Sequence, residues 1–130
     1  MTKRREFTVA GLAPPFSHYC DAVRFGDLLF ISGLVGIDAE GKVVGEGDAV
    51  RQTRQIFENM RKVLDAAGAG FGDVLRVTVY LTNIEDRARI NPVRQEFFGA
   101  ARPASTLVEV SRLVRPDLLV EIEVVVGLPE

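Results

Sequence analysis

His18 and Cys20 flank Tyr19 and are the residue types that could act together as a base and a nucleophile. Strand-like alternation would point both side chains the same way, but we expect no acidic group beside the imidazole to orient it. The chain holds one histidine and one cysteine, too few for a typical zinc site or an internal disulfide. We therefore do not expect catalysis by this pair, and we expect neither a metal nor another cofactor.

Carboxylates recur at every second position of the last apolar run, Leu118 to Val126. A strand there points Glu121 and Glu123 to one face and valines and isoleucine to the other. The runs 74–81 and 105–110 alternate in the same way, with Leu75, Val77, Val79 and Leu81 expected on the aliphatic side. The opposite face mixes Glu, Arg, Ser and Thr with Leu, Val and Tyr. That face is too polar for a dry core and too apolar to be left in water, so we expect it to pack against copies of the chain.

Two amphipathic segments are expected to cover the aliphatic face. Apolar residues at three- and four-residue spacing predict a helix that follows an N-cap at Asp48 and ends at Gly68. A second helical segment lies between residues 84 and 98, where Asn91 and Pro92 suit an N-cap and a first helical position. We predict an irregular turn there, followed by a helix of about two turns from Pro92 to Phe98.

The element order is therefore β-β-α-β-α-β-β, because a hairpin around Gly26-Asp27 precedes the first helix. This order predicts an α+β fold with a mixed sheet and both helices packed on one face. We expect a single domain over residues 1–130, since this length suits one core.

Composition excludes several function classes. Hydrophobic residues make up 47% of the chain and charged residues 26%, as in soluble globular proteins. The net charge of -2 gives no basic excess of the kind that nucleic-acid binding uses. The basic run 3–5 precedes no apolar stretch long enough for a signal peptide or a membrane span. We expect a cytoplasmic protein that binds neither nucleic acid nor membrane.

From Ala13 to Glu123 the sequence resembles the YjgF/RidA (reactive intermediate deaminase) family, also called endoribonuclease L-PSP. The resemblance rests on motifs spread along the chain: Ala13-Pro14 leading to Tyr19, Phe30-Ile31-Ser32-Gly33, Asn59 with Val63 and Ala66-Ala67-Gly68, Val77-Thr78-Val79-Tyr80-Leu81, Asn91 with Phe97-Phe98, Arg102-Pro103-Ala104-Ser105-Thr106-Leu107-Val108-Glu109-Val110, and Glu121-Ile122-Glu123. The segment from Pro103 to Val110 followed by Glu-Ile-Glu is the specific part. The resemblance implies a homotrimer of chorismate-mutase-like subunits, with the sheets facing the centre and three clefts between neighbouring chains. It also implies hydrolysis of reactive enamines and imines, with release of ammonia and a 2-oxo acid.

The resemblance also implies roles for individual residues. Glu121 matches a glutamate beside the attacking water; without that role it is a carboxylate paired with Arg76 or Arg112. Tyr19 matches a residue at the cleft mouth. Ser32 and Gly33 match a strand segment whose backbone meets the ligand, although a glycine in a strand also marks a kink. Two more matching positions are Asn91, which helix capping would equally explain, and Leu107, which stands where the family often has cysteine.

Ser105 is the main departure from the family pattern, since relatives place an arginine there to bind the substrate carboxylate. A serine hydroxyl cannot make the bidentate, charge-assisted pair of a guanidinium. The departure bears on the substrate class and not on the fold. Arg102 and His18 are the residues that could replace the arginine, and Arg102 is equally well explained as a solvated surface charge.

The sequence therefore predicts a trimeric deaminase-like hydrolase with an intersubunit cleft for a small imine, enamine or carbonyl metabolite. The alternative is a member of the family that binds a small molecule without turnover. Ribonuclease activity, which the second family name suggests, fits poorly with one histidine and an acidic balance.

Overall fold

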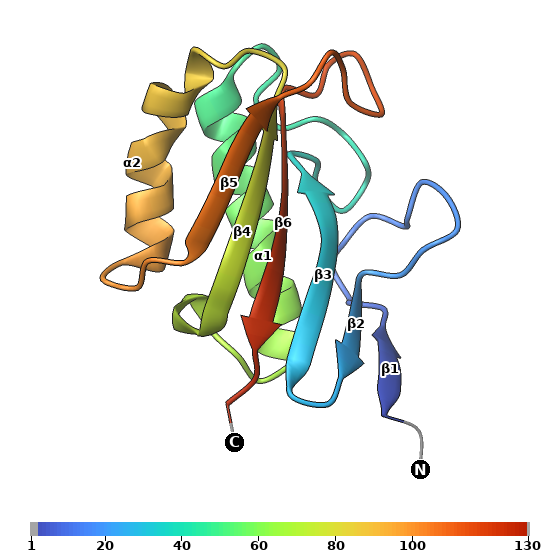
Figure 1. Ribbon diagram of the computed structural model, residues 1–130. Coiled ribbons are helices and arrows are strands. Elements are labelled where there is room, and N and C mark those ends of the chain that lie inside the picture. The colour runs from blue at the N-terminus through green and yellow to red at the C-terminus, as the bar shows by residue number, and fades with distance from the viewer. Residues whose placement is uncertain (1–2, 130) are drawn as a thin grey trace.

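Six strands form one mixed sheet in the computed structural model, which describes residues 3–129 (Figure 1). The strands are β1 (Arg4–Phe7), β2 (Ala22–Phe25), β3 (Leu28–Val35), β4 (Val74–Leu81), β5 (Ala104–Glu109) and β6 (Val120–Gly127). Their order across the sheet is β1-β2-β3-β6-β4-β5, and every neighbouring pair is antiparallel except β4 and β5. The predicted order lacked β1, which pairs with β2 at the edge of the sheet.

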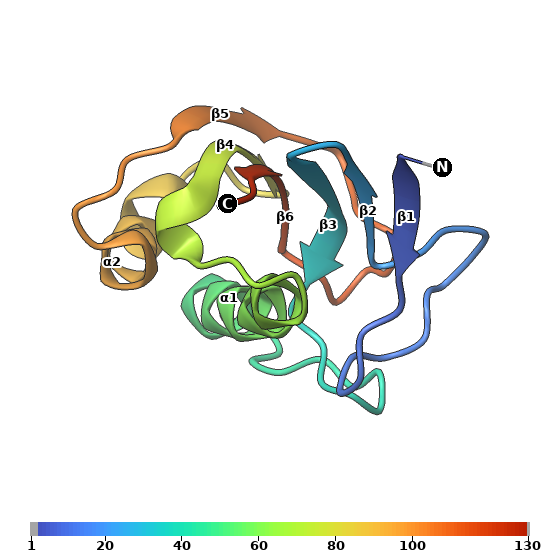
Figure 2. The same cartoon turned by 90° about the horizontal axis from the view of Figure 1, so that it is seen from below.

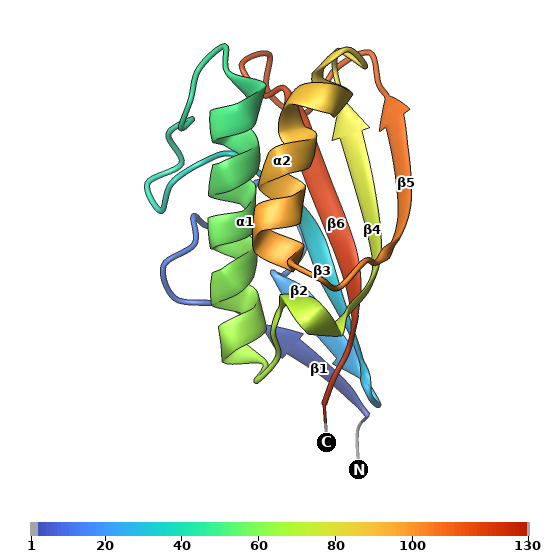
Figure 3. The same cartoon turned by 90° about the vertical axis from the view of Figure 1, so that its left-hand side faces the viewer.

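Two helices, α1 (Ala49–Ala66) and α2 (Asp86–Phe98), cover one face of the sheet, and a 3-10 turn, η1 (Phe71–Asp73), leads into β4 (Figures 2 and 3). The caps predicted for α1 are confirmed. The Asp48 carboxylate accepts the N–H groups of Val50 and Arg51, and Gly68 follows the helix at φ 72°. No helix in residues 3–129 is long and apolar enough to cross a membrane.

The core fills the space between the helices and the sheet, as the strand parity predicts. On β6 the side chains of Val120, Ile122 and Val126 are fully buried, whereas Glu121 and Glu123 lie on the other face. Four phenylalanines close the end of the core, with ring centroids 5.1–6.0 Å apart: Phe57, Phe71, Phe97 and Phe98.

The prediction for α2 was wrong, because this helix begins at Asp86 and contains Pro92. Proline cannot donate to the carbonyl of Ala88 one turn earlier, but both residues lie on the exposed side, where water can reach that carbonyl. The first turns are stabilised instead by the burial of Ile90 and by the ion pair of Asp86 with Arg89 at 2.6 Å. Asn91 is therefore inside the helix and not its cap.

One strand residue also lies on the face opposite to the prediction. A bulge between Val74 and Arg76 shifts the register of β4 against β6. As a result Val74 is buried, whereas Leu75 is 52% exposed on the open face. The same face carries further exposed apolar side chains: Leu28, Phe30 and Val108.

Candidate functional site

Glu121 lies on the open face of the sheet near the start of β6, opposite Tyr80 of β4 and Val35 of β3. Its side chain is half-buried, and this burial raises the pKa of the carboxyl group above its usual range. The negative charge of Glu123, two residues along the same face, raises the pKa further. A carboxylate whose pKa is raised in this way is a better proton acceptor than an ordinary carboxylate.

Glu123 is engaged differently. It accepts a hydrogen bond from the Tyr80 hydroxyl, and this bond is the main reason why the pKa of Tyr80 is raised. The predicted alternative partner of Glu121, Arg76, donates to Thr106 at 2.6 Å. Glu121 takes part in no ion pair within residues 3–129.

A bulge in β3 brings Ser32 and Gly33 beneath Glu121. The register of β3 against β6 shifts between Ile31 and Leu34, so both residues of the bulge face the single position Glu123. A Cβ atom on Gly33 would lie 2.9 Å from Cδ of Glu121, closer than side chains pack. Glycine thus allows the carboxylate to take this position, which a larger residue would displace, and its backbone does not need a positive φ.

A cavity of about 320 Å³ opens over this carboxylate. Its walls come from the loop before β2, the β3 bulge, the loop before β6 and β6 itself: Phe16, Ser17, Tyr19, Ser32, Gly33, Val35, Val114 and Glu121. The Tyr19 hydroxyl accepts the N–H of Phe16 at 3.1 Å, and the Ser32 hydroxyl donates to the Cys20 carbonyl at 2.6 Å. The first bond lies within the loop before β2, and the second holds that loop against the bulge.

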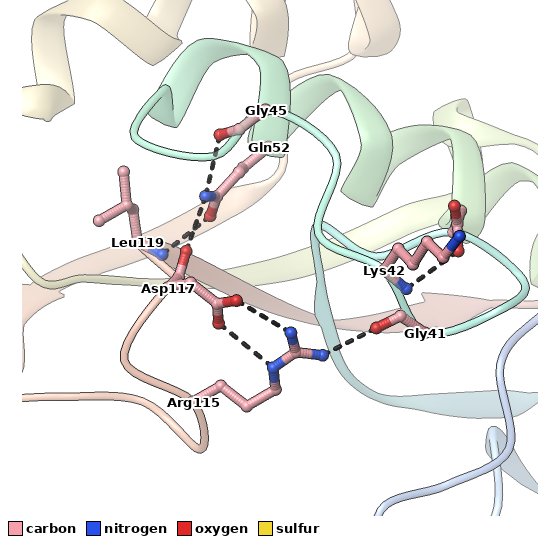
Figure 4. A network of polar contacts seen from close by, with 8 residues as sticks. Gly41, Lys42, Gly45, Gln52, Arg115, Asp117 and Leu119 are labelled. Carbon is pink, nitrogen blue, oxygen red and sulfur yellow. Dashed lines mark hydrogen bonds and ion pairs between the residues drawn. The ribbon is translucent and has the colours of Figure 1, made fainter.

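The opposite wall is fixed by a polar network that sequence reasoning missed (Figure 4). Gln52 of α1 is fully buried; its amide donates to the carbonyls of Gly45 and Asp117 and accepts the N–H of Leu119. Arg115 pairs with Asp117 at 2.9 Å and donates to the Gly41 carbonyl at 2.7 Å. These bonds hold the loop that carries Val114, a wall residue of the cavity. An amide at a core-facing position of the helix pattern was the available clue to Gln52.

The other predicted site residues lie elsewhere in the subunit. Ser105 and Leu107 are paired in β5 with Val77 and Val79 of β4, both buried, and so belong to the helix-covered side of the sheet. Asn91 lines a separate cavity between α2 and the segment before β5. Within one chain, therefore, Tyr19, Ser32, Gly33 and Glu121 come together, whereas Asn91, Ser105 and Leu107 do not join them.

The two candidate anion anchors are also apart from Glu121. His18 and Cys20 line a hollow beside β1, and the Cys20 thiol donates to the Ala22 carbonyl at 3.4 Å. Arg102 lines the same cavity as Asn91. In residues 3–129 no three His, Cys, Asp or Glu side chains cluster in a way that could hold a metal ion.

Comparison with known proteins identifies the family. The endoribonuclease L-PSP family model matches residues 11–127. A RutC family protein of Pyrococcus horikoshii is 44% identical over 85% of this chain and 87% of its own length. The 3-aminoacrylate deaminase RutC of Acinetobacter baylyi is 37% identical, covering 86% of this chain and 88% of its own. A 2-iminobutanoate/2-iminopropanoate deaminase of Dermatophagoides farinae is 35% identical, and the match covers 88% of this chain and 90% of the relative's length.

The fold gives the same result. The crystal structure of YyfA, a Rid family protein of unknown function from Yersinia pestis, superposes with a TM-score of 0.90 at 31% identity, covering 96% of this chain and 99% of that one. The chain therefore belongs to the endoribonuclease L-PSP family, the YjgF/RidA family that its motifs indicate, and has that family's chorismate-mutase-like fold.

Proposed function

We propose that this protein hydrolyses a small imine or enamine metabolite to a carbonyl compound and ammonia, with Glu121 as the general base. The observation that carries the proposal is the half-buried Glu121 carboxyl group of raised pKa, which lines a cavity of about 320 Å³. Relatives that act on 3-aminoacrylate and on 2-iminobutanoate or 2-iminopropanoate support this reaction class.

The reaction consumes one water molecule. The imine is protonated in water at neutral pH, and its carbon is then open to attack from above Glu121. The carboxylate takes a proton from the attacking water as the C–O bond forms. The same proton then passes to the nitrogen of the carbinolamine. As the C–N bond breaks and ammonia leaves, the hydroxyl gives its proton to the Glu121 carboxylate and becomes the carbonyl, and the carboxyl group then releases this proton to the ammonia or to water. Tyr19 lines the same cavity, and the Ser32-Gly33 bulge leaves room for the carboxylate.

We further propose that the complete cleft is shared by two subunits of a homotrimer. Glu121 faces the open side of the sheet, whereas Ser105 and Asn91 lie on or beside its helix-covered side. One subunit cannot present both groups to one small molecule. The open face provides a surface for packing against another copy, because it carries exposed apolar side chains. Phe30, for example, is 47% exposed and Val108 is 40% exposed.

A second candidate is binding of a neutral small molecule without turnover. The described walls of the Glu121 cavity include no arginine or lysine that would hold a carboxylate. An occupant bound by this subunit alone would therefore be uncharged or cationic.

The test is ammonia release from an imine formed in situ by an amino-acid oxidase, measured against the spontaneous rate. Glu121→Gln keeps the shape of the side chain and removes the base, so we expect turnover to fall by about a hundredfold or more. Pyruvate binding should change far less than turnover. Equal turnover by the wild type and Glu121→Gln would contradict the proposal, and binding without turnover in the wild type would favour the second candidate.

A further inference from the structure

Large apolar side chains are left exposed around the cavity over Glu121. In residues 3–129 nine such side chains are exposed, and five of them lie on strands of the sheet. Of the other four, three line this one cavity: Phe16, Tyr19 and Val114. Single exposed apolar residues are common, but a group of them around a hollow indicates a site for an apolar ligand.

Val114 is the most exposed of the nine, at 62%. The loop that carries it is nevertheless held in place, because the neighbouring Arg115 pairs with Asp117 at 2.9 Å and donates to the Gly41 carbonyl at 2.7 Å. A fixed loop therefore holds an exposed apolar side chain at the wall of the cavity. Phe16 lines the same cavity from the loop before β2.

The cavity has a polar part on the sheet and an apolar part on the loops. Glu121 and Ser32 belong to strands, whereas Phe16 and Val114 belong to loops. In the proposed reaction the imine carbon must lie close to Glu121, so that the carboxylate can take a proton from the attacking water. The group attached to that carbon is then the part of the substrate that reaches Phe16 and Val114.

The size of the cavity indicates how large this group is. A volume of about 320 Å³ has room for roughly ten water-sized groups of ~30 Å³ each. The imine of alanine has little more than half that number of non-hydrogen atoms, and its methyl group would leave the apolar walls in contact with water. The imine of leucine, with its isobutyl group, would occupy most of the space.

We propose that Val114 and Phe16 bind an apolar substituent on the reacting carbon and thereby select imines whose substituent is larger than methyl. The inference rests on the proposed function, because it names the part of that substrate that lies beside the loops. Burial of the substituent removes apolar surface of both the ligand and the protein from water, which favours binding in proportion to the area covered.

The experiment measures binding of two hydrolysis products, pyruvate and 4-methyl-2-oxopentanoate, to the assembled protein by calorimetry. Both probes carry the same carboxylate and carbonyl groups, so a difference in affinity reports on the substituent alone. The wild type should bind 4-methyl-2-oxopentanoate about ten- to fiftyfold more tightly, as expected for burial of its three additional carbon atoms. Val114→Ser should lower this preference about three- to tenfold and leave pyruvate binding within about twofold.

Ile84→Ser is the matched control, since Ile84 is the one exposed apolar residue of the four outside strands that does not line the cavity. The inference is overturned if the wild type binds both probes equally, or if Val114→Ser keeps the preference as Ile84→Ser should. A smaller mass of Val114→Ser in light scattering would assign Val114 to a contact between subunits and would overturn it as well.

A second variant decides if Val114→Ser does not fold. Val114→Trp fills the cavity, so it should lose the preference for 4-methyl-2-oxopentanoate while still binding pyruvate, and an unchanged preference would overturn the inference. Turnover is scored separately with Glu121→Gln. Glu121-dependent turnover without a preference between the probes refutes this inference alone, and a Val114-dependent preference without turnover refutes the proposed function alone.

Discussion

Gly33→Ala tests whether the position of the Glu121 carboxylate limits catalysis. The added methyl group would lie 2.9 Å from Cδ and 3.2 Å from Cγ of Glu121. Carbon atoms pack at about 3.5–4.0 Å, so the carboxylate must move by roughly 0.5–1 Å. A displacement of about 1 Å at a catalytic group can lower the rate a hundredfold, and we expect a loss of about ten- to a hundredfold.

Stability should respond differently. Gly33 does not have a positive φ, so alanine introduces no backbone strain. Alanine also reduces the conformational freedom of the unfolded chain, which favours folding by about 0.5–1 kcal/mol. This gain offsets part of the cost of moving the Glu121 side chain, so we expect the free energy of unfolding to change by less than about 1 kcal/mol.

The assay compares ammonia release with unfolding in urea for wild type, Gly33→Ala and Gly72→Ala. Gly72 is the control, because a Cβ atom there would meet nothing within 4 Å and its φ is not positive. Gly72→Ala should keep full activity. Full activity in Gly33→Ala would refute the reasoning, since the carboxylate would then work from a displaced position or not be needed at all.

Three further outcomes are expected. Gln52→Leu should lower the free energy of unfolding by about 2–4 kcal/mol, because it leaves the partners of a buried amide unsatisfied. The control in the same urea titration is Gln55→Leu, which removes one partly buried hydrogen bond to Asn59. Equal losses of stability in the two variants would refute the role of the network. Glu121→Gln should be more stable than wild type at pH 7–8, by about 0.5–2 kcal/mol as is common when a desolvated functional group is replaced. Folding raises the pKa of Glu121 above 4.5, so the wild type loses stability as the pH rises through the folded-state pKa. The difference in stability between the variant and the wild type should therefore vanish below pH 4.5. A difference that grows toward low pH would contradict this prediction. Light scattering should give the mass of three chains, and a stable monomer at micromolar concentration would contradict the shared cleft.

Local rules predicted much of the fold from the sequence. The ends of α1 at Asp48 and Gly68 could be predicted, because helix capping and a positive φ depend on residues that are adjacent in the sequence. The alternation on β6 placed Glu121 on the open face because side chains of a strand point to opposite faces by geometry alone. Glu121, Tyr19, Ser32 and Gly33 were predicted as site residues from family motifs, and the structure brings these four together around one cavity.

The features that were missed depend on contacts distant in sequence. Pro92 argued for a late helix start, but the burial of Ile90 against the core outweighed it. The bulge that exposes Leu75 arises from the register of β4 against β6, some fifty residues later, and alternation within β4 cannot reveal it. The hydrogen bond from Arg94 to the Ser105 hydroxyl was not predicted, because it joins α2 to β5 across their crossover.

The sheet geometry connects assembly with the proposed chemistry. The parallel pairing of β4 and β5 places Ser105 beside Val77 on the helix-covered side, whereas the antiparallel pairing of β4 and β6 places Glu121 beside Tyr80 on the open side. Within one subunit the sheet lies between Ser105 and Glu121, and no rotation of either side chain can bring the two together. If one small molecule contacts both Ser105 and Glu121, it must lie between two copies of the chain. Packing of the exposed apolar face would then be required for catalysis as well as for stability.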